Sequence, residues 1–397
     1  MARGVAGARA WVLHFPLSPP QTGVQPEHFP RRNTDVEQRA FNFSAGPAGL
    51  PLPVLEKIQR DLLVYPGAGA SVMEISHRSK TFAAIHEQAK SNIKQLLNLP
   101  DNYHVLFAQG GATMQFTMIG MNFLQGKSAD YIDCGAWAKK AIEEAKKFGT
   151  ARVCWTGKAE NYKRMPKTPD LDLDANAAFV HMTSNETIQG IEFFDEPETG
   201  SVPLIADASS DFLSRPIDIS KYALLYAGAQ KNVGPSGVAV AIIRDDMLER
   251  VPAGLPSLLD YRLLQENDSL YNTPPCFAIY VVALTTQWLL DEMGGLAGIE
   301  AHNRKKAAIL YDAIDQSGGF YVGHAERDSR SLMNVTFVLA NKDLEGEFIA
   351  QAKAAGLDEL KGHRSVGGCR ASIYNAMPLA GCEALAQFMR DFQQKHG

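Results

Sequence analysis

The chain has 397 residues, of which 45% are hydrophobic and 21% are charged, so it can bury a substantial core and we expect two domains. Its formal net charge of -5 and the lack of a long basic run argue against nucleic acid as a partner. The five cysteines are scattered without a C-x-x-C pair, which favours a reducing compartment and argues against a metal site or a disulfide framework.

Residues 1–40 differ in composition from the rest of the chain. They contain five prolines, and no acid precedes Glu27. Two interpretations stay open: an organellar transit peptide, which would be basic and removed, or a disordered extension. Scarce serine and a weak amphipathic pattern favour the extension. In either case these residues lie outside the predicted fold.

From Phe41 onward, short apolar segments alternate with helical ones. Strands are predicted at residues 104–108, 129–133, 178–182, 203–207 and 237–243, and an amphipathic helix at 79–97. The apolar run 276–290 is interrupted by polar residues and is predicted to be a buried helix rather than a membrane span. Strands separated by helices indicate an α/β fold with a mainly parallel sheet covered on both faces.

Ligands of such sheets bind beyond the carboxyl ends of the strands. Asp133, Thr187 and Asp207 lie at or just beyond predicted strand ends. Two nucleotide motifs fail: Val72 occupies the third glycine position of a dinucleotide fingerprint, and Met121 stands where a P-loop needs its first glycine. A nucleotide site is therefore not predicted.

The segment YAGAQKN places Lys231 directly after a predicted strand at 222–226 and before a Gly-Pro turn. A lone lysine is usually a solvated loop residue. Here small neighbours surround it, and Asp207 ends an earlier strand. Pyridoxal 5'-phosphate needs a lysine that bonds to its aldehyde and an acid beside its ring nitrogen. Lys231 and Asp207 are the candidate catalytic residues.

Together with ADASS at 206–210 and SRPID at 214–218, the YAGAQKN segment resembles the phosphoserine aminotransferases, and the likeness runs from Phe41 to Gly397. The resemblance implies a class-V aminotransferase of fold type I that depends on pyridoxal phosphate. It further implies a large cofactor-binding domain at 41–295, with the segment 41–51 near the active site. A smaller α+β domain at 296–397 would complete the chain.

The cofactor phosphate needs backbone N–H groups at a helix start, and the segment Gln109 to Thr113 offers them after a strand. By itself this glycine pair could be a simple tight turn. Relatives often carry a third glycine where Ala112 stands and arginine or cysteine where Thr113 stands. The departure keeps a backbone N–H and a hydroxyl for the phosphate, but it removes any arginine contact to the substrate at this position.

The resemblance assigns three further cofactor contacts. Trp137 would stack on the pyridine ring, although a lone tryptophan is more often part of a core. Thr187 would hydrogen-bond the phenolic oxygen, although it could be a simple turn residue. Gln230, next to Lys231, is also expected at the cofactor.

The expected substrate carries an anion at each end, and arginine forks suit both anions. The resemblance implies that Arg370 holds the α-carboxylate. The distal anion would be bound by His363, Arg364 and Arg78.

The motif Asn272-Thr273-Pro274-Pro275 predicts an extended loop. In relatives this loop completes the cofactor-phosphate site of the other subunit. Asn272 and Thr273 are therefore expected cofactor contacts in a homodimer with shared active sites.

The resemblance implies transfer of the amino group of L-glutamate to 3-phosphohydroxypyruvate in serine biosynthesis. It leaves open a second role in pyridoxine biosynthesis, on 4-phosphohydroxy-L-threonine. The alternatives are an aspartate or alanine–glyoxylate transaminase and a non-catalytic protein of the same fold. A cytoplasmic location is expected, or an organellar one if residues 1–40 are a transit peptide.

Overall fold

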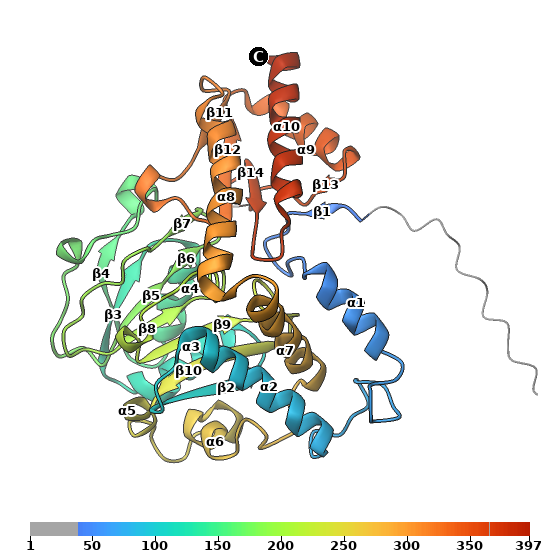
Figure 1. Cartoon of the computed structure of the whole chain (residues 1–397). Coiled ribbons are helices and arrows are strands. Elements are labelled where there is room, and N and C mark those ends of the chain that lie inside the picture. The colour runs from blue at the N-terminus through green and yellow to red at the C-terminus, as the bar shows by residue number, and fades with distance from the viewer. Residues whose placement is uncertain (1–38, 365) are drawn as a thin grey trace, which may run out of the picture. The chain divides into compact units, whose positions relative to one another are not determined.

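The computed structural model describes residues 39–364 and 366–397, so all but the last two residues of the predicted extension at 1–40 lie outside the described residues. Its centre is a seven-stranded sheet in the order β2-β10-β9-β8-β5-β3-β4 (Figure 1). Strand β10 pairs antiparallel with both β2 and β9, and the other neighbouring strands of this sheet pair in parallel. The prediction of a mainly parallel α/β sheet is confirmed. The strands are β2 (Tyr103–Gln109), β3 (Ser128–Asp133), β4 (Thr150–Thr156), β5 (Val180–Thr183), β8 (Leu204–Asp207), β9 (Leu224–Gly228) and β10 (Val238–Arg244).

Strand β10 shows why the sheet is covered on both faces. Its side chains alternate: Val240 and Ile242 enter the core that contains α2 (Lys80–Leu97) and α7 (Cys276–Asp291). Ala241 and Ile243 enter a second core with α3 (Ala112–Ile119) and α4 (Ala136–Ala145). Because both faces are buried, the strand is an unbroken apolar run.

Helix α2 matches the predicted helix because the sequence carries signals at both of its ends. The Ser79 side chain accepts a hydrogen bond from Phe82 N at 3.1 Å and caps the N-terminus. Asn98 adopts a left-handed conformation after the last turn. The predicted apolar face, with Ile85, Ala89 and Ile93 among its residues, is buried against the sheet.

The C-terminal part has its own antiparallel sheet and core. The sheet order is β11-β12-β14, and helices α8, α9 and α10 pack with it (Figure 1). Phe43 from the start of the described chain enters this core, and β1 pairs in parallel with β13. The domain boundary at residues 295 and 296 stays a prediction. The elements are β1 (Phe41–Asn42), α8 (Gly295–Asp315), β11 (Tyr321–Gly323), β12 (Asn334–Leu339), α9 (Glu345–Ala354), β13 (Leu357–Asp358), β14 (Cys369–Ser372) and α10 (Leu379–His396).

Shorter elements connect these parts. A β-hairpin lies between β5 and β8, and a π-helical turn extends α3. The connecting elements are α1 (Leu52–Asp61), the π-turn (Gly120–Leu124), β6 (Asn185–Glu186), β7 (Ile191–Glu192), α5 (Asp245–Leu248) and α6 (Tyr261–Glu266).

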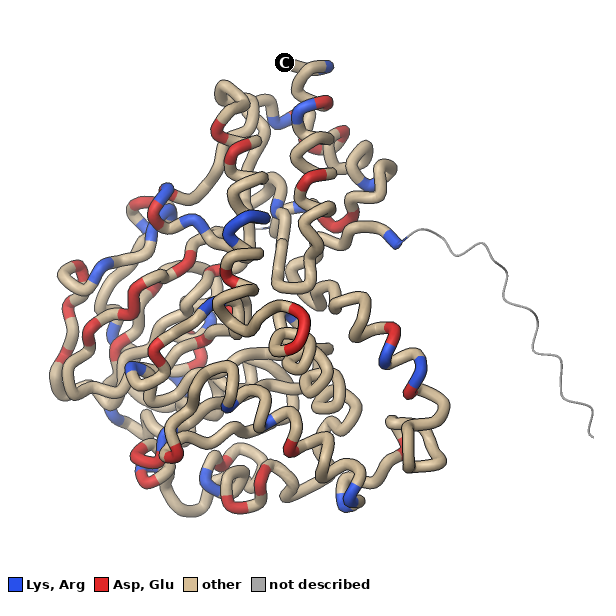
Figure 2. The backbone as a smooth tube through the Cα atoms, in the orientation of Figure 1, with Lys and Arg blue, Asp and Glu red and all other residues tan. Residues whose placement is uncertain are grey.

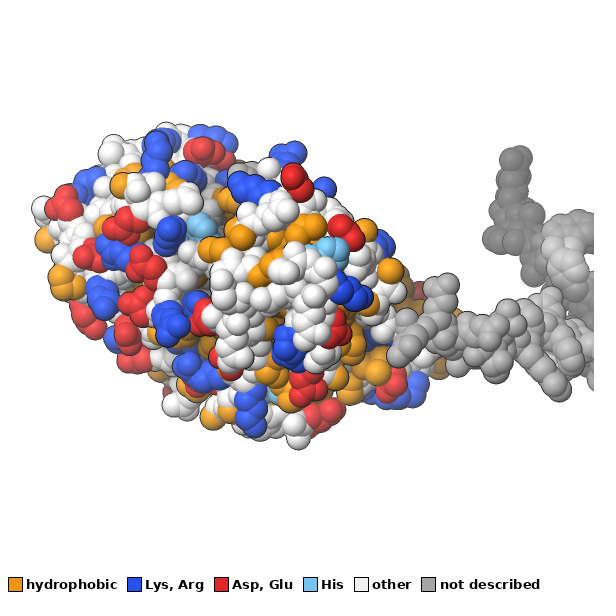
Figure 3. All heavy atoms as spheres, turned by 90° about the horizontal axis from the view of Figure 1, so that it is seen from above, with side chains coloured by type: hydrophobic (Ala, Val, Ile, Leu, Met, Phe, Trp, Pro, Cys, Tyr) orange, Lys and Arg blue, Asp and Glu red, His pale blue; other side chains and the backbone are white. Residues whose placement is uncertain are grey.

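Charges of both signs are interspersed along the described chain (Figure 2). The face shown in Figure 3 likewise mixes charged and apolar side chains and carries no continuous basic surface. Within the described residues, no helix has the length and apolar character needed to cross a membrane.

Candidate active site

Lys231 lies in the turn that follows β9, at the carboxyl edge of the large sheet. The carbonyl of Ala229 accepts hydrogen bonds from Val233 N and Gly234 N, which fixes the turn. Lys231 Nζ donates to Thr187 Oγ1 at 2.7 Å and lies 5.1 Å from the centre of the Trp137 ring. These three residues, predicted from separate motifs, are thus brought together.

Burial lowers the pKa of Lys231, Asp207 and Glu186 oppose the shift, and Arg370 adds to it. Within the described residues, no carboxylate lies within ion-pairing distance of Nζ. The neutral amine, which is the form that can attack an aldehyde, is therefore more accessible than at a surface lysine.

Asp207 ends β8 and is buried. Its Oδ1 accepts from Ser209 N at 2.9 Å and from Ser209 Oγ at 2.6 Å. Burial raises the pKa of Asp207, while Lys231 and Ser209 oppose the shift. No hydrogen bond of the described residues engages Oδ2, so this oxygen can accept a hydrogen bond from a protonated ring nitrogen.

Trp137 is held in place by Glu186, a residue not anticipated from the sequence. Trp137 N donates to both carboxylate oxygens at 3.0 and 3.1 Å, and Ala138 N donates to Oε1 at 2.8 Å. Gly135 makes this approach possible, because a Cβ there would lie 2.6 Å from Glu186 Cδ. The available signal was the position of this acid directly before Thr187. Glu186 therefore caps α4 and orients the predicted stacking residue.

The predicted phosphate cup lies at the start of α3. Gly110 has a φ of +94°, and Gly111 is the N-cap without a side-chain cap. The N–H groups of Ala112 and Thr113 have no acceptor among the described residues. Two N–H donors at a helix N-terminus form an anion site.

The loop at 272–275 approaches this cup within the same chain. Gln109 Nε2 donates to Thr273 O at 3.3 Å. No side-chain contact of Asn272 or Thr273 joins them to Lys231 within the described residues.

Residues 45–48 and Gln230 cover Lys231 from another side. Ala48 N donates to Gln230 O at 2.8 Å, and a Cβ on Gly46 would lie 3.7 Å from Lys231 Cγ. The Gln230 amide packs against Gly228, where a Cβ would lie 2.6 Å from its Oε1. The Gln230 side chain therefore lies against the strand end, and its role as a cofactor contact stays a prediction.

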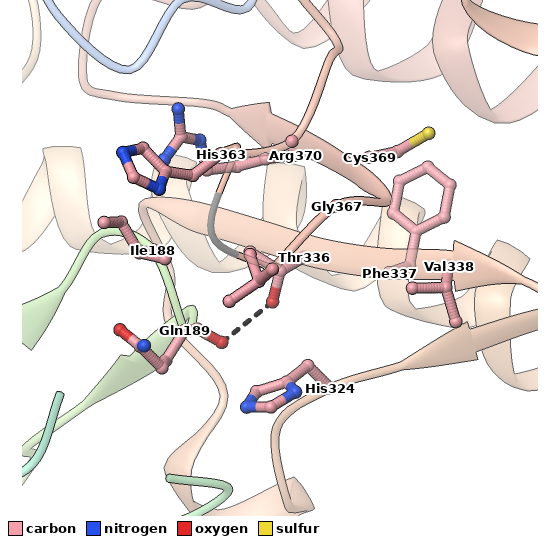
Figure 4. A pocket seen from close by; sticks show the side chains of 12 residues that line it. Ile188, Gln189, His324, Thr336, Phe337, Val338, His363, Gly367, Cys369 and Arg370 are labelled. Atoms are coloured by element: carbon pink, nitrogen blue, oxygen red, sulfur yellow. Dashed lines mark hydrogen bonds between the residues drawn. The ribbon is translucent and has the colours of Figure 1, made fainter. Parts of the chain in front are cut away.

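The structure brings two of the four predicted substrate residues, His363 and Arg370, into one pocket, whereas Arg364 and Arg78 are exposed. Arg370 on β14 and His363 lie together beside Ile188 and line one pocket, and His324 lines the same pocket beyond Thr336 (Figure 4). The Thr336 hydroxyl donates to Gln189 O at 2.8 Å, which joins β12 to the Thr187 segment.

Arg370 takes part in no ion pair among the described residues, and burial lowers its pKa. Arg364 is exposed next to His363. Arg78 is also exposed, directly before α2, and no contact of the described residues joins it to this group. Its role as a substrate contact stays a prediction.

These residues fit pyridoxal 5'-phosphate. The fit rests on the unpartnered N–H groups of the cup, on Lys231 in contact with Thr187, and on the buried Trp137 Nε1, which has no partner among the described residues. A lysine at the carboxyl edge of a mainly parallel sheet, beside a buried strand-end aspartate, defines a pyridoxal-phosphate-dependent enzyme of fold type I.

Comparison with known proteins identifies the family of the chain. A model of the class-V aminotransferase family matches residues 40–385. A phosphoserine aminotransferase of Geobacillus kaustophilus is 56% identical over 359 residues, which cover 90% of this chain and 99% of the relative. The chain therefore belongs to the class-V aminotransferases and, within them, to the phosphoserine aminotransferase family.

Solved structures agree with this result. The phosphoserine aminotransferase from Bacillus circulans subsp. alkalophilus matches with a TM-score of 0.88 and 53% identity, covering 90% of this chain and 99% of that one. A PLP-bound phosphoserine aminotransferase from Trichomonas vaginalis matches with a TM-score of 0.84 and 40% identity, covering 89% and 100%. The predicted class, a pyridoxal-phosphate-dependent aminotransferase, is confirmed.

Proposed function

We propose that the protein reversibly transfers the amino group of L-glutamate to 3-phosphohydroxypyruvate, giving O-phospho-L-serine and 2-oxoglutarate. The observation that carries the proposal is the position of Lys231, which contacts Thr187 and Trp137. The charge of Arg370 is also close enough to lower the pKa of Lys231. A reactive amine beside a guanidinium without an acidic partner suits an anionic amino acid.

Pyridoxal phosphate, when bound, supplies the electron sink for loss of the Cα proton. Lys231 Nζ would hold its aldehyde, and the N–H groups of Ala112 and Thr113 would hold its phosphate. Trp137 would lie on its ring, and Asp207 Oδ2 would keep the ring nitrogen protonated. Asn272 and Gln230 are proposed as further contacts.

Lys231 also moves the proton. As a free amine whose pKa burial lowers, Nζ would take a proton from the substrate carbon and return it. The Thr187 hydroxyl, 2.7 Å away, limits where Nζ can lie. Burial of the surrounding strand ends keeps bulk water from competing for this proton.

Arg370 would bind the α-carboxylate, which every substrate shares, because its planar fork matches a carboxylate. His363, Arg364 and Arg78 would bind the distal anion, a phosphate in one half-reaction and a carboxylate in the other. The same distal anion is present in 4-phosphohydroxy-L-threonine, which makes it a second candidate substrate.

The absorbance spectrum of the protein with bound pyridoxal phosphate tests this proposal. We expect a band near the visible edge that bleaches with L-glutamate and returns with 3-phosphohydroxypyruvate. Bleaching by glutamate with recovery by oxaloacetate or glyoxylate, but not by 3-phosphohydroxypyruvate, would favour an aspartate or alanine–glyoxylate transaminase instead. No spectral change with any amino acid would contradict catalysis altogether.

We also propose a homodimer in which the loop at 272–275 reaches the partner's cofactor phosphate. Tyr271, beside the loop, and Met114, in the first turn of α3, are 48% and 40% exposed, and the partner subunit would cover them. The contact between Gln109 and Thr273 places the loop next to the cup within one chain, so the two arrangements need an experiment to separate them.

Subunit mixing provides that experiment. Lys231→Ala chains are reassembled with chains that carry both Asn272→Ala and Thr273→Ala, each inactive but dimeric alone. Shared sites predict recovery of up to about a quarter of wild-type activity, because about half the dimers are mixed and each has one intact site. No recovery, with mixed dimers confirmed by native mass spectrometry, would place the loop in its own subunit's site.

A cytoplasmic location is proposed because all five cysteines are free. Imaging of the full chain fused at its C-terminus to a fluorescent protein tests it. Fluorescence confined to an organelle would contradict this proposal and favour the transit-peptide interpretation of residues 1–40.

A further inference from the structure

A cluster of positive charge without acidic partners lies on the substrate side of the site. Arg370 lines a pocket together with His363, Arg364 follows His363 in the chain, and the charge of Lys140 is close enough to lower the pKa of His363; we call Lys140, Arg364 and Arg370 the cation cluster. None of its lysine and arginine side chains takes part in an ion pair among the described residues. By contrast, Arg152 elsewhere in the chain binds an aspartate at 2.6 Å. In a chain with 44 acids and 39 basic residues, such a cluster favours binding of an external anion.

Lys140 is the member of the cation cluster that sequence motifs did not identify. It lies on α4 three residues after Trp137, so both side chains project from one face of the helix. Lys140 Nζ is 4.2 Å from the centre of the Trp137 ring, and Lys231 Nζ is 5.1 Å from the same point. The two nitrogens are therefore less than about 10 Å apart.

This separation suits the proposed substrates. An amino acid held at Lys231 carries its distal group only a few bonds from the reacting carbon. The lysine side chain is flexible and its ammonium is a compact charge, so it can leave the Trp137 ring and reach an anion that enters the site. Lys140 is exposed, and no acceptor of the described residues restrains it.

His363 shows that Lys140 belongs electrostatically to the same group. Burial lowers the pKa of His363, and the charges of Arg370, Arg364 and Lys140 lower it further. An anion placed among these residues reverses their effect and favours the protonated, doubly donating imidazole. A phosphate, with a charge of about −1.5 to −2, gains more from this group than a carboxylate does.

We propose that Lys140 contacts the distal phosphate of the substrate and favours phosphorylated over carboxylated amino acids. The inference rests on the proposed function and adds a specificity-determining residue to it. The alternative role is structural: the Lys140 ammonium stabilises the orientation of the Trp137 ring and does not contact the substrate. That role predicts an equal effect on every substrate, so kinetics can separate the two.

The test compares Lys140→Ala with Lys139→Ala in the enzyme with bound pyridoxal phosphate. Lys139 is a matched control because it lies on the same helix but contacts the Tyr162 ring, at 4.6 Å. We expect Lys140→Ala to lower kcat/KM for phosphoserine about 10-fold, mainly through KM, because a charge-assisted contact is lost. The value for glutamate should fall less, that for alanine should stay within about 2-fold, and Lys140→Arg should restore most of the phosphoserine activity.

Each other outcome overturns the inference. Equal losses for phosphoserine, glutamate and alanine would show that Lys140 acts through Trp137. A loss of kcat/KM no larger than that of Lys139→Ala would show that Lys140 is a solvated lysine without a substrate contact. A wild-type protein without phosphoserine activity would overturn the proposed function and this inference with it. An active wild type with either of the first two results would overturn the inference alone.

Discussion

Replacing Glu186 by glutamine is expected to remove a pH dependence from the free energy of unfolding. The Glu186 carboxyl group is buried beneath the first turn of α4 and accepts hydrogen bonds from Trp137 N and Ala138 N. Burial raises the pKa of Glu186 to about 7, with the two N–H groups and Lys231 opposing the shift and Asp207 adding to it. Glutamine keeps a similar shape and an acceptor oxygen but cannot ionise.

The sign follows from proton binding. The ordinary pKa of this group is 4.5, so between about pH 4.5 and 7 the folded chain holds the Glu186 proton more tightly than the unfolded chain. The stabilisation is complete below pH 4.5 and is lost as pH rises through 7. A shift of this size corresponds to roughly 3 kcal/mol. Between pH 5 and 8, the stability of the Gln variant relative to wild type should rise by about that amount.

Denaturant unfolding of both full-length proteins at matched concentrations and several pH values measures this difference. Subtracting the two curves removes the titration of other buried acids that both proteins share. Glu186→Ala serves as a control, because it leaves two N–H groups without an acceptor and should be roughly 1–3 kcal/mol less stable than the Gln variant at every pH. Parallel stability curves for wild type and the Gln variant would refute the reasoning, since they would mean that the helix N-terminus keeps Glu186 ionised in the folded chain.

Lys231→Ala should abolish transamination but still bind the cofactor noncovalently through its phosphate; normal turnover would reject the lysine as catalytic. Asp207→Ala should lower kcat by roughly 100-fold or more and weaken cofactor binding, because a buried charge partner is lost, and unchanged steady-state kinetics would mean that another acid holds the ring. Arg370→Ala should weaken every amino acid, whereas Arg364→Ala should weaken phosphoserine and glutamate but spare alanine. Titrations with the three amino acids check this division, and equal loss of alanine in both variants would contradict it.

The parts of the fold that the sequence predicted correctly depend on local signals. Helix α2 follows from its apolar spacing together with Ser79 at its start and Asn98 at its end. The direction of β10 was not predicted, because an apolar run buried on both faces reads the same in either direction. The pairing of β1 with β13 joins segments more than 300 residues apart in the sequence, and neither two-residue strand carries a periodic pattern.

The candidate site shows the same limit. Lys231 and Asp207 were predicted because one follows and the other ends a predicted strand, and parallel strands bring such ends to one edge. The role of Thr187 was predicted from the family resemblance. Glu186 and Lys140 were not, since the role of each depends on where α4 packs. An acid in a short strand and a lysine on a helix surface have ordinary structural explanations until the contacts with Trp137 are known.

The arrangement of charge around Lys231 joins these observations. Asp207 and Glu186, both buried at strand ends, raise the pKa of Lys231, and Arg370, on β14, lowers it. A proton is therefore favoured near the acids, where the ring nitrogen would lie, and anions are favoured near the arginine. The two acids lie on β8 and β6, whereas the arginine lies on β14. A change in the separation of these strands would therefore alter both substrate binding and the proton affinity of Lys231. Binding of an anion at Arg370 should thus raise the pKa of Lys231, which links substrate recognition to the state of the catalytic amine.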